Sequence, residues 1–392
     1  MIGLAGSIHV VPPMNVATGY LAPMAHAVKK LVPIPVFVAG RINQPQEAER
    51  ILAGGQADMI GMTRAQICDP EIANKAREGR SDDIRACIAC NQACIGHMQM
   101  GLGISCIQRP ETGREIDYEV KQPAATPRTV IVAGGGPAGM KAAAVAAERG
   151  HRVILCEASG RLGGQALLAQ ELPGRAEFGG IVTNLAREMA RHGVEVRLNT
   201  EATRALVEAE GADAAIVATG ALPWRPPLEG EEEAHLVDAW AVVRGEANVG
   251  GRVVIADWRC DWIGLGLAEK LARDGCKVTL AVNGTMPGQT IQMYVRDRWA
   301  GELHRLGVEV IPYARLFGAD ATSAYLQHVI SGEPIIVEEV DTVVTALGHH
   351  SVTALADELD GWDGEVLMAG DCLSPRTCEE AVLEGMQAGI AV

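Results

Sequence analysis

The sequence predicts an α/β protein that is built around parallel β-sheets. Short apolar runs suited to buried strands alternate with segments of helical period, an order typical of a parallel α/β architecture. The chain also contains a βαβ unit with a glycine-rich turn and a second unit of the same layout. Its 392 residues, 48% apolar and 21% charged, are enough for two or three domains with separate cores.

The first elements are two βα units in succession. PVFVAG (35–40) and ADMIGM (57–62) read as strands buried on both faces. Each strand opens into a polar or basic loop and is followed by a helical segment, at 44–55 and 69–80. This pattern predicts parallel strands whose carboxyl ends share one edge.

A cysteine-rich loop follows, with the spacing C-x2-C-x3-C-x11-C. Its members are Cys87, Cys90, Cys94 and Cys106. Four thiolates in a compact loop suit a [4Fe–4S] cluster, which takes one sulfur for each iron. A zinc site and four unrelated buried cysteines remain open, although zinc ribbons usually pair two short knuckles across a longer gap. His97 lies inside the loop, and we expect it to be a neighbour of the site and not a ligand.

A polar linker, 117–128, leads to the first complete βαβ unit. Gly134, Gly136 and Gly139 form G-x-G-x-x-G directly after the strand TVIVA. The first glycine permits the tight turn, the second lets a pyrophosphate approach the backbone, and the third lets helix and strand pack closely. Glu157 ends the next strand at the distance where an acid binds ribose hydroxyls. We therefore predict a dinucleotide or ADP site.

The second βαβ unit, 251–282, carries a defective fingerprint. It offers Gly264 and Gly266, but we place Glu269 where the third glycine belongs. The loop is lengthened, and the charges of Asp257 and Asp261 would oppose a pyrophosphate. NAD(P)H binding and a domain retained only for packing both remain open.

The composition limits the partners that we expect. A formal net charge of −15 argues against nucleic acid or an anionic membrane and leaves a small-molecule substrate open. No run reaches the roughly 18 apolar residues of a membrane span, and the start, MIGLAGSIHVVPPM, lacks the features of a secretory signal. The remaining six cysteines show no disulfide framework, which predicts a reducing cytoplasm. They are Cys68, Cys156, Cys260, Cys276, Cys372 and Cys378.

The order of these parts resembles the iron–sulfur flavoenzymes of the old yellow enzyme superfamily. That group includes 2,4-dienoyl-CoA reductase, trimethylamine dehydrogenase and N-demethylases of methylated amino acids. The resemblance covers essentially the whole chain, and its most specific piece is the cysteine spacing after GMTRAQICDP. It implies an FMN-binding barrel, a cluster loop and two Rossmann-like domains.

The resemblance also assigns binding residues. In that family the last two barrel strands grip the FMN phosphate, and the matching residues are Gly40, Arg41, Met62, Thr63 and Arg64. Backbone N–H groups at strand ends and an arginine fork suit a phosphate, although both arginines could be ordinary surface residues. Two later segments resemble the pieces that close an FAD site. They contribute Thr219, Gly220 and Asp371, and read from the residues alone Asp371 could merely cap a loop.

The implied domains follow from these assignments. They are the C-terminal part of the barrel (1–86), the cluster loop (87–116), an FAD- or ADP-binding domain (128–249 with 346–392) and an NAD(P)-type domain (250–345). A whole barrel needs about 200 residues or more, and fewer than 90 precede the cysteines. The family's catalytic Tyr and His residues fall in the absent strands, so the catalytic residues are unknown. We expect a fragment of a longer enzyme or one half of a split enzyme.

Three functions remain in competition. The first is an FMN and [4Fe–4S] oxidoreductase that demethylates or dehydrogenates a methylated amine and discharges to electron-transfer flavoprotein or another carrier. The second is an NAD(P)H-dependent enoate or dienoyl-CoA reductase. The third is a non-catalytic relay or nucleotide-binding subunit, with a companion chain or a missing N-terminal half. We also expect a homo-oligomer.

Overall fold

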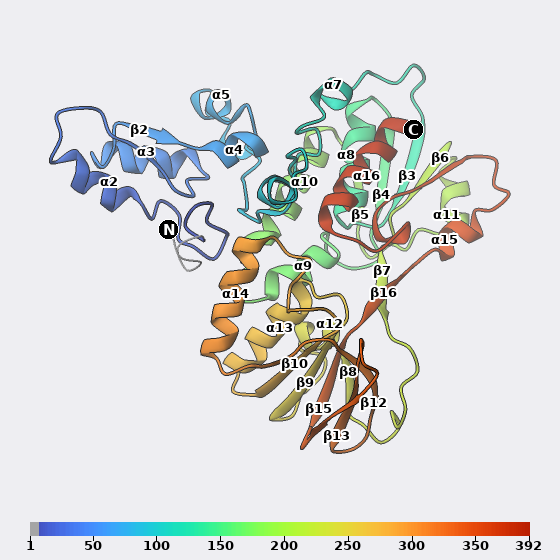
Figure 1. Ribbon diagram of the computed structural model, residues 1–392. Helices are drawn as coiled ribbons and strands as arrows, with labels where there is room; N and C mark the ends of the chain where they lie inside the picture. Colours follow the sequence, from blue (N-terminus) through green and yellow to red (C-terminus); the bar gives the residue numbers. More distant parts are fainter. Residues whose placement is uncertain (1–7) are drawn as a thin grey trace. The chain divides into compact units, whose positions relative to one another are not determined.

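The computed structural model describes residues 8–392, which divide into two compact units (Figure 1). The start of the predicted domain 1–86, residues 1–7, lies outside the described part. Unit 2 comprises His9–Ala166, Glu177–Gly220 and Ser351–Val392, and unit 1 comprises Leu167–Ala176 and Ala221–His350 with Ile8. Each unit encloses its own buried apolar core. The predicted α/β class is confirmed.

A five-stranded parallel sheet forms the centre of unit 2, in the order β17-β6-β3-β4-β5. Its strands are β3 (Thr129–Ala133), β4 (Arg152–Cys156), β5 (Glu195–Arg197), β6 (Ala214–Val217) and β17 (Glu365–Met368). The apolar runs predicted as strands form β3 and β4, and almost all of their residues are buried.

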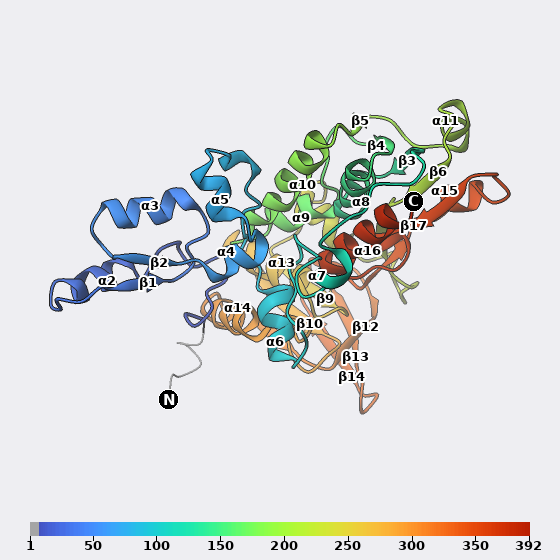
Figure 2. The same ribbon diagram turned by 90° about the horizontal axis from the view of Figure 1, so that it is seen from above.

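Helix α8 follows β3 and packs against two other helices of unit 2. It spans Pro137–Glu148, and its neighbours are α10 (Gly180–Arg191) and α16 (Cys378–Ala391), as Figure 2 shows. Further helices here are α6 (His97–Gln99), α7 (Glu115–Tyr118), α11 (Arg204–Ala209) and α15 (Ala354–Glu358), while α9 (Gln165–Glu171) begins where the chain passes into unit 1.

The first residues of unit 2 form a small sheet with helices. β1 (Phe37–Ala39) and β2 (Met59–Gly61) pair in parallel. The helices are α2 (Ala22–Lys29), α3 (Pro45–Ala53), α4 (Thr63–Cys68) and α5 (Ile72–Arg77). Burial of both strands on both faces was predicted and is wrong, because Phe37 and Met59 are 64% and 55% exposed. A core on one side only, around Val38 and Ile51, holds this part together.

Unit 1 contains a second five-stranded parallel sheet, in the order β11-β10-β9-β15-β8. Its strands are β8 (Leu236–Asp238), β9 (Arg252–Asp257), β10 (Lys277–Val282), β11 (Glu309–Ile311) and β15 (Thr342–Ala346). An antiparallel sheet is added by β12 (Ala314–Ala319), β13 (Ser323–His328) and β14 (Pro334–Glu338). The helices are α12 (Ala239–Arg244), α13 (Trp262–Arg273) and α14 (Met293–Arg305).

The division into units differs from the expected border between the two nucleotide-type domains, which lies at 249/250 and 345/346. The chain leaves unit 2 for a short segment at 167–176 and for a long one at 221–350. The reason is that β8 pairs with β15 and therefore belongs to the sheet of unit 1. Strands β7 (Ala221–Trp224) and β16 (Gly348–Ser351) pair where the chain crosses.

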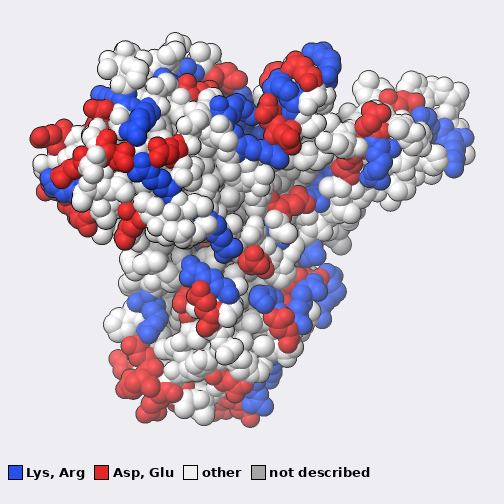
Figure 3. All heavy atoms as spheres, turned by 180° about the vertical axis from the view of Figure 1, so that it is seen from behind, with Lys and Arg blue, Asp and Glu red and all other residues white. Residues whose placement is uncertain are grey.

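The surface agrees with the acidic composition. Figure 3 shows Asp and Glu side chains gathered on part of unit 1, while both signs of charge mix over much of unit 2. Within residues 8–392, no helix combines the length and the apolar character that a membrane crossing requires.

Candidate functional site

The four predicted cluster ligands lie on one loop of unit 2, between α5 and α7. Cys94 belongs to a π-helical turn (Gln92–Gly96), a feature common at functional sites. All four thiols are partly buried and form no disulfide. Burial, and then the neighbouring thiols, raise the pKa of Cys87, Cys90 and Cys94. The loop therefore brings the four cysteines close enough to interact.

Backbone N–H groups lie near all four sulfur atoms. The N–H of Ala89 donates to Cys87 Sγ at 3.4 Å. The backbone N–H groups of Gln92, Ile95 and Gln108 act to lower the pKa of Cys90, Cys94 and Cys106, whereas burial acts to raise it. Such donors stabilise the thiolate, which is the form that binds metal. These surroundings fit the demands of a thiolate-ligated cluster.

The arrangement differs from that of a single-ion site. Across the described residues, no three His, Cys, Asp or Glu side chains converge as the ligands of one metal ion do. A four-iron cluster requires something else, because each iron takes its own thiolate. The residues present fit that group through their number, their proximity and their N–H donors.

Arg64 lies beside the cysteine loop. It is the second residue of α4, and its Nη1 donates to Asn91 Oδ1 at 2.5 Å. Its positive charge lowers the pKa of Cys87 and Cys94, against the larger effect of burial. Asn91 itself adopts a left-handed backbone (φ 59°) and donates to Val11 O at 2.8 Å. Arg64 is thus a fixed cation at the edge of the loop.

Gly40 and Arg41 form a sharp turn at the carboxyl end of β1. Both have positive φ, 133° and 50°, and such a backbone in a residue other than glycine often marks a functional site. The buried guanidinium of Arg41 donates to the carboxylate of Glu177 and to Val16 O. A phosphate at this position would share Arg41 with Glu177.

Met62 and Thr63 continue from β2 into the first turn of α4, where Met62 is the N-cap residue. Met62 was expected at the end of the strand and Thr63 in the loop after it, whereas in the structure the two residues form a strand-to-helix junction. Because β1 and β2 are parallel, this junction lies at the same edge as the turn after β1. The structure thus places all five predicted phosphate residues at one edge.

Two of the three fingerprint glycines, Gly134 and Gly139, occupy positions that only glycine fits. A Cβ at Gly134, where φ is 109°, would lie 2.3 Å from Ala218 O, and one at Gly139 would lie 2.0 Å from Gly134 O. At Gly136, by contrast, nothing lies within 4 Å. The turn is therefore packed tightly on the protein side, and Gly136 faces open space where a pyrophosphate can approach.

The other predicted nucleotide residues lie close to this turn. Glu157 accepts the N–H of Gly135 at 2.7 Å and that of Ser159 at 2.8 Å. Asp371 Oδ2 accepts Gln165 Nε2 at 2.8 Å. The hydroxyl of Thr219 is used elsewhere, because it donates to Val352 O at 2.6 Å. Gly220 follows it with φ 77°.

Some residues of the site were not predicted. Gly163 donates to Gly135 O at 2.8 Å, and a Cβ at Gly164 would lie 3.1 Å from Gly136 Cα. This second glycine turn therefore packs against the fingerprint. The two adjacent glycines in the sequence are the feature that could have predicted it. Gln165 carried no signal, because its role depends on Asp371, which lies 206 residues away.

The first two parallel strands of each five-stranded sheet pair from their first residues, so residues of unit 1 can be aligned with residues of unit 2. Thr129 pairs with Arg152 in unit 2, and Arg252 pairs with Lys277 in unit 1. Counting five residues on, the first fingerprint glycine of unit 2 matches Asp257 of unit 1. In unit 1, an aspartate thus occupies the position of the glycine that permits the tight turn.

The helices that follow confirm this match and correct one prediction. Gly264 is the third residue of α13, as Gly139 is of α8, and a Cβ there would lie 2.2 Å from Asp257 Oδ2. Gly264, and not Glu269, therefore stands at the third glycine position. Glu269 faces another helix and accepts Trp299 Nε1 at 2.6 Å.

The side chain of Asp257 obstructs the binding of a dinucleotide in unit 1 through its volume more than through its charge. Burial raises the pKa of Asp257 well above its ordinary value, so this carboxyl favours the neutral form. Asp261 already caps α13 by accepting Ile263 N at 3.0 Å. At the position that matches Glu157, unit 1 has Val282. The turn thus lacks the free space of the fingerprint and the acid that binds the ribose hydroxyls of NAD.

A family model described as pyridine nucleotide-disulphide oxidoreductase matches residues 128–385, which is more than half of the chain. The chain belongs to this family. The model of the NADH:flavin oxidoreductase / NADH oxidase family matches residues 7–83. These families bind flavins and nicotinamide nucleotides, and the combination confirms the predicted resemblance and an oxidoreductase enzyme.

Curated relatives have several activities. The chain is 31% identical over 425 residues to an N,N-dimethylglycine/sarcosine dehydrogenase of Chromohalobacter salexigens, covering 97% of this chain and 60% of that protein. It is 32% identical to a metal reductase of Desulforamulus reducens (94% and 59%) and 40% identical to an NADH oxidase of Thermoanaerobacter brockii (68% and 42%). The chain thus spans about three fifths of the first two.

Solved structures with the same fold include two oxidoreductases. Histamine dehydrogenase from Rhizobium sp. 4-9 matches with a TM-score of 0.91 and 25% identity, over 97% of this chain and 59% of that one. A 2-naphthoyl-CoA reductase matches with a TM-score of 0.90 and 29% identity, over 97% and 57%.

Proposed function

We propose that this protein is an FMN- and [4Fe–4S]-dependent oxidoreductase that removes hydride from the N-methyl group of a methylated amine or amino acid. The electrons would leave through the cysteine loop to an external carrier, such as electron-transfer flavoprotein. The observation that carries this choice is Asp257, which fills the turn where unit 1 would bind NAD(P)H. Relatives named as a dimethylglycine/sarcosine dehydrogenase and a dimethylamine dehydrogenase support the substrate class.

The residues of unit 2 would hold three groups. When bound, FMN accepts the hydride and the cluster carries single electrons. Arg41, Arg64 and the backbone around Gly40 would bind the FMN phosphate. The open face of Gly136 and the carboxylate of Glu157 would bind the pyrophosphate and ribose of FAD or ADP.

Arg64 has a further part in this proposal. It lies at the phosphate edge and also beside Cys87 and Cys94. A fixed positive charge there would favour the arrival of an electron on the cluster. The substrate pocket would be completed by further barrel strands, from additional residues or a companion chain, and the assembly would be a homo-oligomer. We also propose a reducing cytoplasm as the compartment, in keeping with ten cysteines that form no disulfide in the described part of the chain.

The reductase alternative is favoured by relatives named as a cinnamate reductase and an NADH oxidase. In that case NAD(P)H would reduce unit 2 through unit 1. The described turn at Asp257 opposes this route, and the two proposals differ in the direction of electron flow.

An anaerobic absorbance spectrum with NADH, dimethylglycine, sarcosine and dithionite separates them. We expect flavin and iron–sulfur bands that persist with NADH, bleach with dithionite and bleach with an N-methylated substrate once the barrel is complete. Bleaching by NADH would instead establish the reductase. A colourless protein would contradict both and leave the non-catalytic subunit.

A further inference from the structure

Arg41 is a buried arginine with one unsatisfied donor. Its side chain is 3% exposed, Nη1 donates to Val16 O, and Nη2 donates to the carboxylate of Glu177. Nε is buried as well, and within residues 8–392 it has no hydrogen-bond partner. A charged donor that has lost its water and found no acceptor is costly. This nitrogen therefore points to a ligand from outside the chain.

The position of Arg41 is fixed by the segment that precedes α2. Arg41 O accepts the N–H of Gly19 at 3.3 Å, and the guanidinium donates to Val16 O, so backbone and side chain are both held. The residue also adopts a left-handed backbone (φ 50°) directly after Gly40. Because the guanidinium is held in this way, an anion has to come to it.

Glu177, in contrast, can separate from Arg41 at little cost. It lies in a short 3₁₀ helix, Ala176–Gly179, and its side chain is 42% exposed. Water can therefore solvate the carboxylate once the ion pair opens. The other arginine of the phosphate edge differs, since Arg64 donates to the neutral amide of Asn91 at 2.5 Å. At Arg41 the chain itself supplies an anion where the FMN phosphate is expected.

We propose that Glu177 is a substitute for the phosphate of FMN: it neutralises Arg41 before FMN binds and competes with the phosphate for Arg41 when FMN binds. The inference rests on the proposed function, because it requires FMN at Arg41. Two anions at one buried guanidinium repel each other, so Glu177 lowers the affinity for FMN. The same carboxylate stabilises the FMN-free protein, because it neutralises a buried cation. Glu177 therefore acts in opposite directions on cofactor affinity and on stability.

The test is a titration of the flavin-free protein with FMN and with riboflavin, followed by flavin fluorescence in a buffer without phosphate. Thermal unfolding of each protein is measured with and without FMN. Glu177→Gln keeps an oxygen acceptor for Arg41 and removes the charge, while riboflavin lacks the phosphate. Glu210→Gln is the matched control, because it removes a carboxylate of unit 2 that pairs with Arg197 at 2.6 Å and with Arg152 at 3.2 Å.

We expect Glu177→Gln to bind FMN about tenfold more tightly than wild type, a moderate effect because water partly screens an exposed carboxylate. Its affinity for riboflavin should not change. Without FMN, this variant should unfold about 2–4 °C below wild type, and saturating FMN should remove the difference. Glu210→Gln should bind FMN as wild type does.

Two results would overturn the inference. One is an affinity for FMN that is unchanged or lower in Glu177→Gln, which would leave Glu177 with the orientation of Arg41 alone. The other is an equal gain in affinity for riboflavin, because the effect would then not concern the phosphate. A wild-type protein and variants that all fail to bind FMN would instead refute the FMN site of the proposed function, and the wild-type titration distinguishes this case.

Discussion

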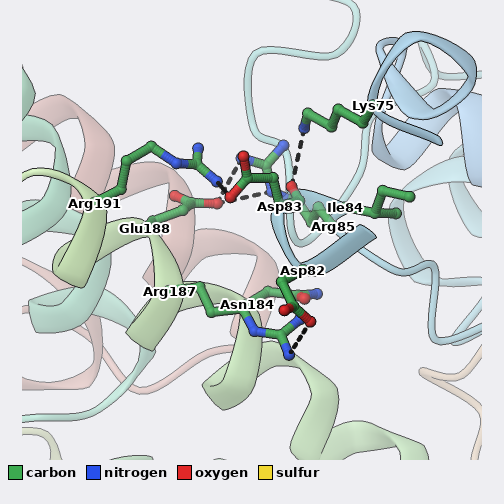
Figure 4. A pocket seen from close by; sticks show the side chains of 9 residues that line it. All are labelled: Lys75, Asp82, Asp83, Ile84, Arg85, Asn184, Arg187, Glu188 and Arg191. Carbon is green, nitrogen blue, oxygen red and sulfur yellow. Dashed lines mark hydrogen bonds and ion pairs between the residues drawn. The ribbon is translucent and has the colours of Figure 1, made fainter. Parts of the chain in front are cut away.

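A chain of buried charges joins the cysteine loop to the helix of the glycine fingerprint. Arg85 Nε lies 2.8 Å from Glu188 Oε1, and Lys141 Nζ on α8 lies 3.0 Å from Glu188 Oε2. Glu111 lies 3.7 Å from Lys141 and 2.9 Å from Lys121. Figure 4 shows Arg85 and Glu188 facing each other beside α10. Removing one member would leave an uncompensated buried charge.

Glu188 should make the protein sensitive to acid. Burial alone would raise its pKa, but Arg85 and Lys141 outweigh burial and lower the pKa to about 2 from the ordinary 4.5. Its contribution to stability is therefore complete above pH 4.5 and is lost as the pH falls toward 2. We expect Glu188→Gln to lower the free energy of unfolding at pH 7 by about 3 kcal/mol and to weaken the pH dependence below 4.5.

Urea unfolding at pH 7 and at pH 3.5 measures this effect. The control is Glu208→Gln, which removes an exposed pair with Arg204 and should change stability by less than about 1 kcal/mol. If Glu188→Gln and wild type lost stability equally between these pH values, the assigned role of Glu188 would be refuted.

At the scale of elements, α8 and α16 approach each other through glycines. A Cβ at Gly385 would lie 2.2 Å from Ala138 O, and one at Gly389 would lie 2.7 Å from Ala142 O. The alanine-rich surface of α8 permits this contact. Because α8 begins at the fingerprint, α16 holds the nucleotide turn in place.

Gly385→Ala should therefore destabilise unit 2. The new methyl group meets backbone and not a flexible side chain, so we expect a loss of about 1–3 kcal/mol in urea unfolding. Gly301→Ala in α14 is the control, since only the end of Arg305 lies near it, at 4.0 Å. That change should stabilise by up to about 1 kcal/mol through helix propensity. Equal effects of the two substitutions would show that the contact does not limit stability.

At the scale of the whole molecule, the nucleotide turn lies entirely within unit 2. Its residues come from 134–165 and 219–220, with Asp371 from the last segment. Unit 1 has separate cores, around Ile255 and around Val254. A ligand of this turn should therefore stabilise one unit directly.

Calorimetry with ADP tests this expectation. At 100 times its Kd, ADP should add about 2.7 kcal/mol to one transition and leave the transition of unit 1 in place. Gly136→Ala is the matched variant, because its methyl group enters open space in the free protein and the space of the pyrophosphate in the complex. It should unfold like wild type without ADP and bind ADP about tenfold more weakly. An equal shift of both transitions, or full binding by the variant, would contradict the assignment.

Several features could be predicted from the sequence because they depend on residues that lie close together in the chain. The strand before Gly134, the helix after it and the spacing from Cys87 to Cys106 are local patterns. Their geometry follows from the φ preferences of glycine and from apolar periodicity, and the structure brings these residues together as expected. The resemblance to an oxidoreductase family also rests on these local patterns.

Other features were decided only by the tertiary structure. Gln165 meets Asp371 and Gly385 meets Ala138 because the fold places distant segments side by side. The spacing along the chain also predicted Glu269 at the third glycine position, whereas two extra residues in the loop of unit 1 place Gly264 there. Burial and contact between distant residues are properties of the folded chain, and they determine which groups can tune a site.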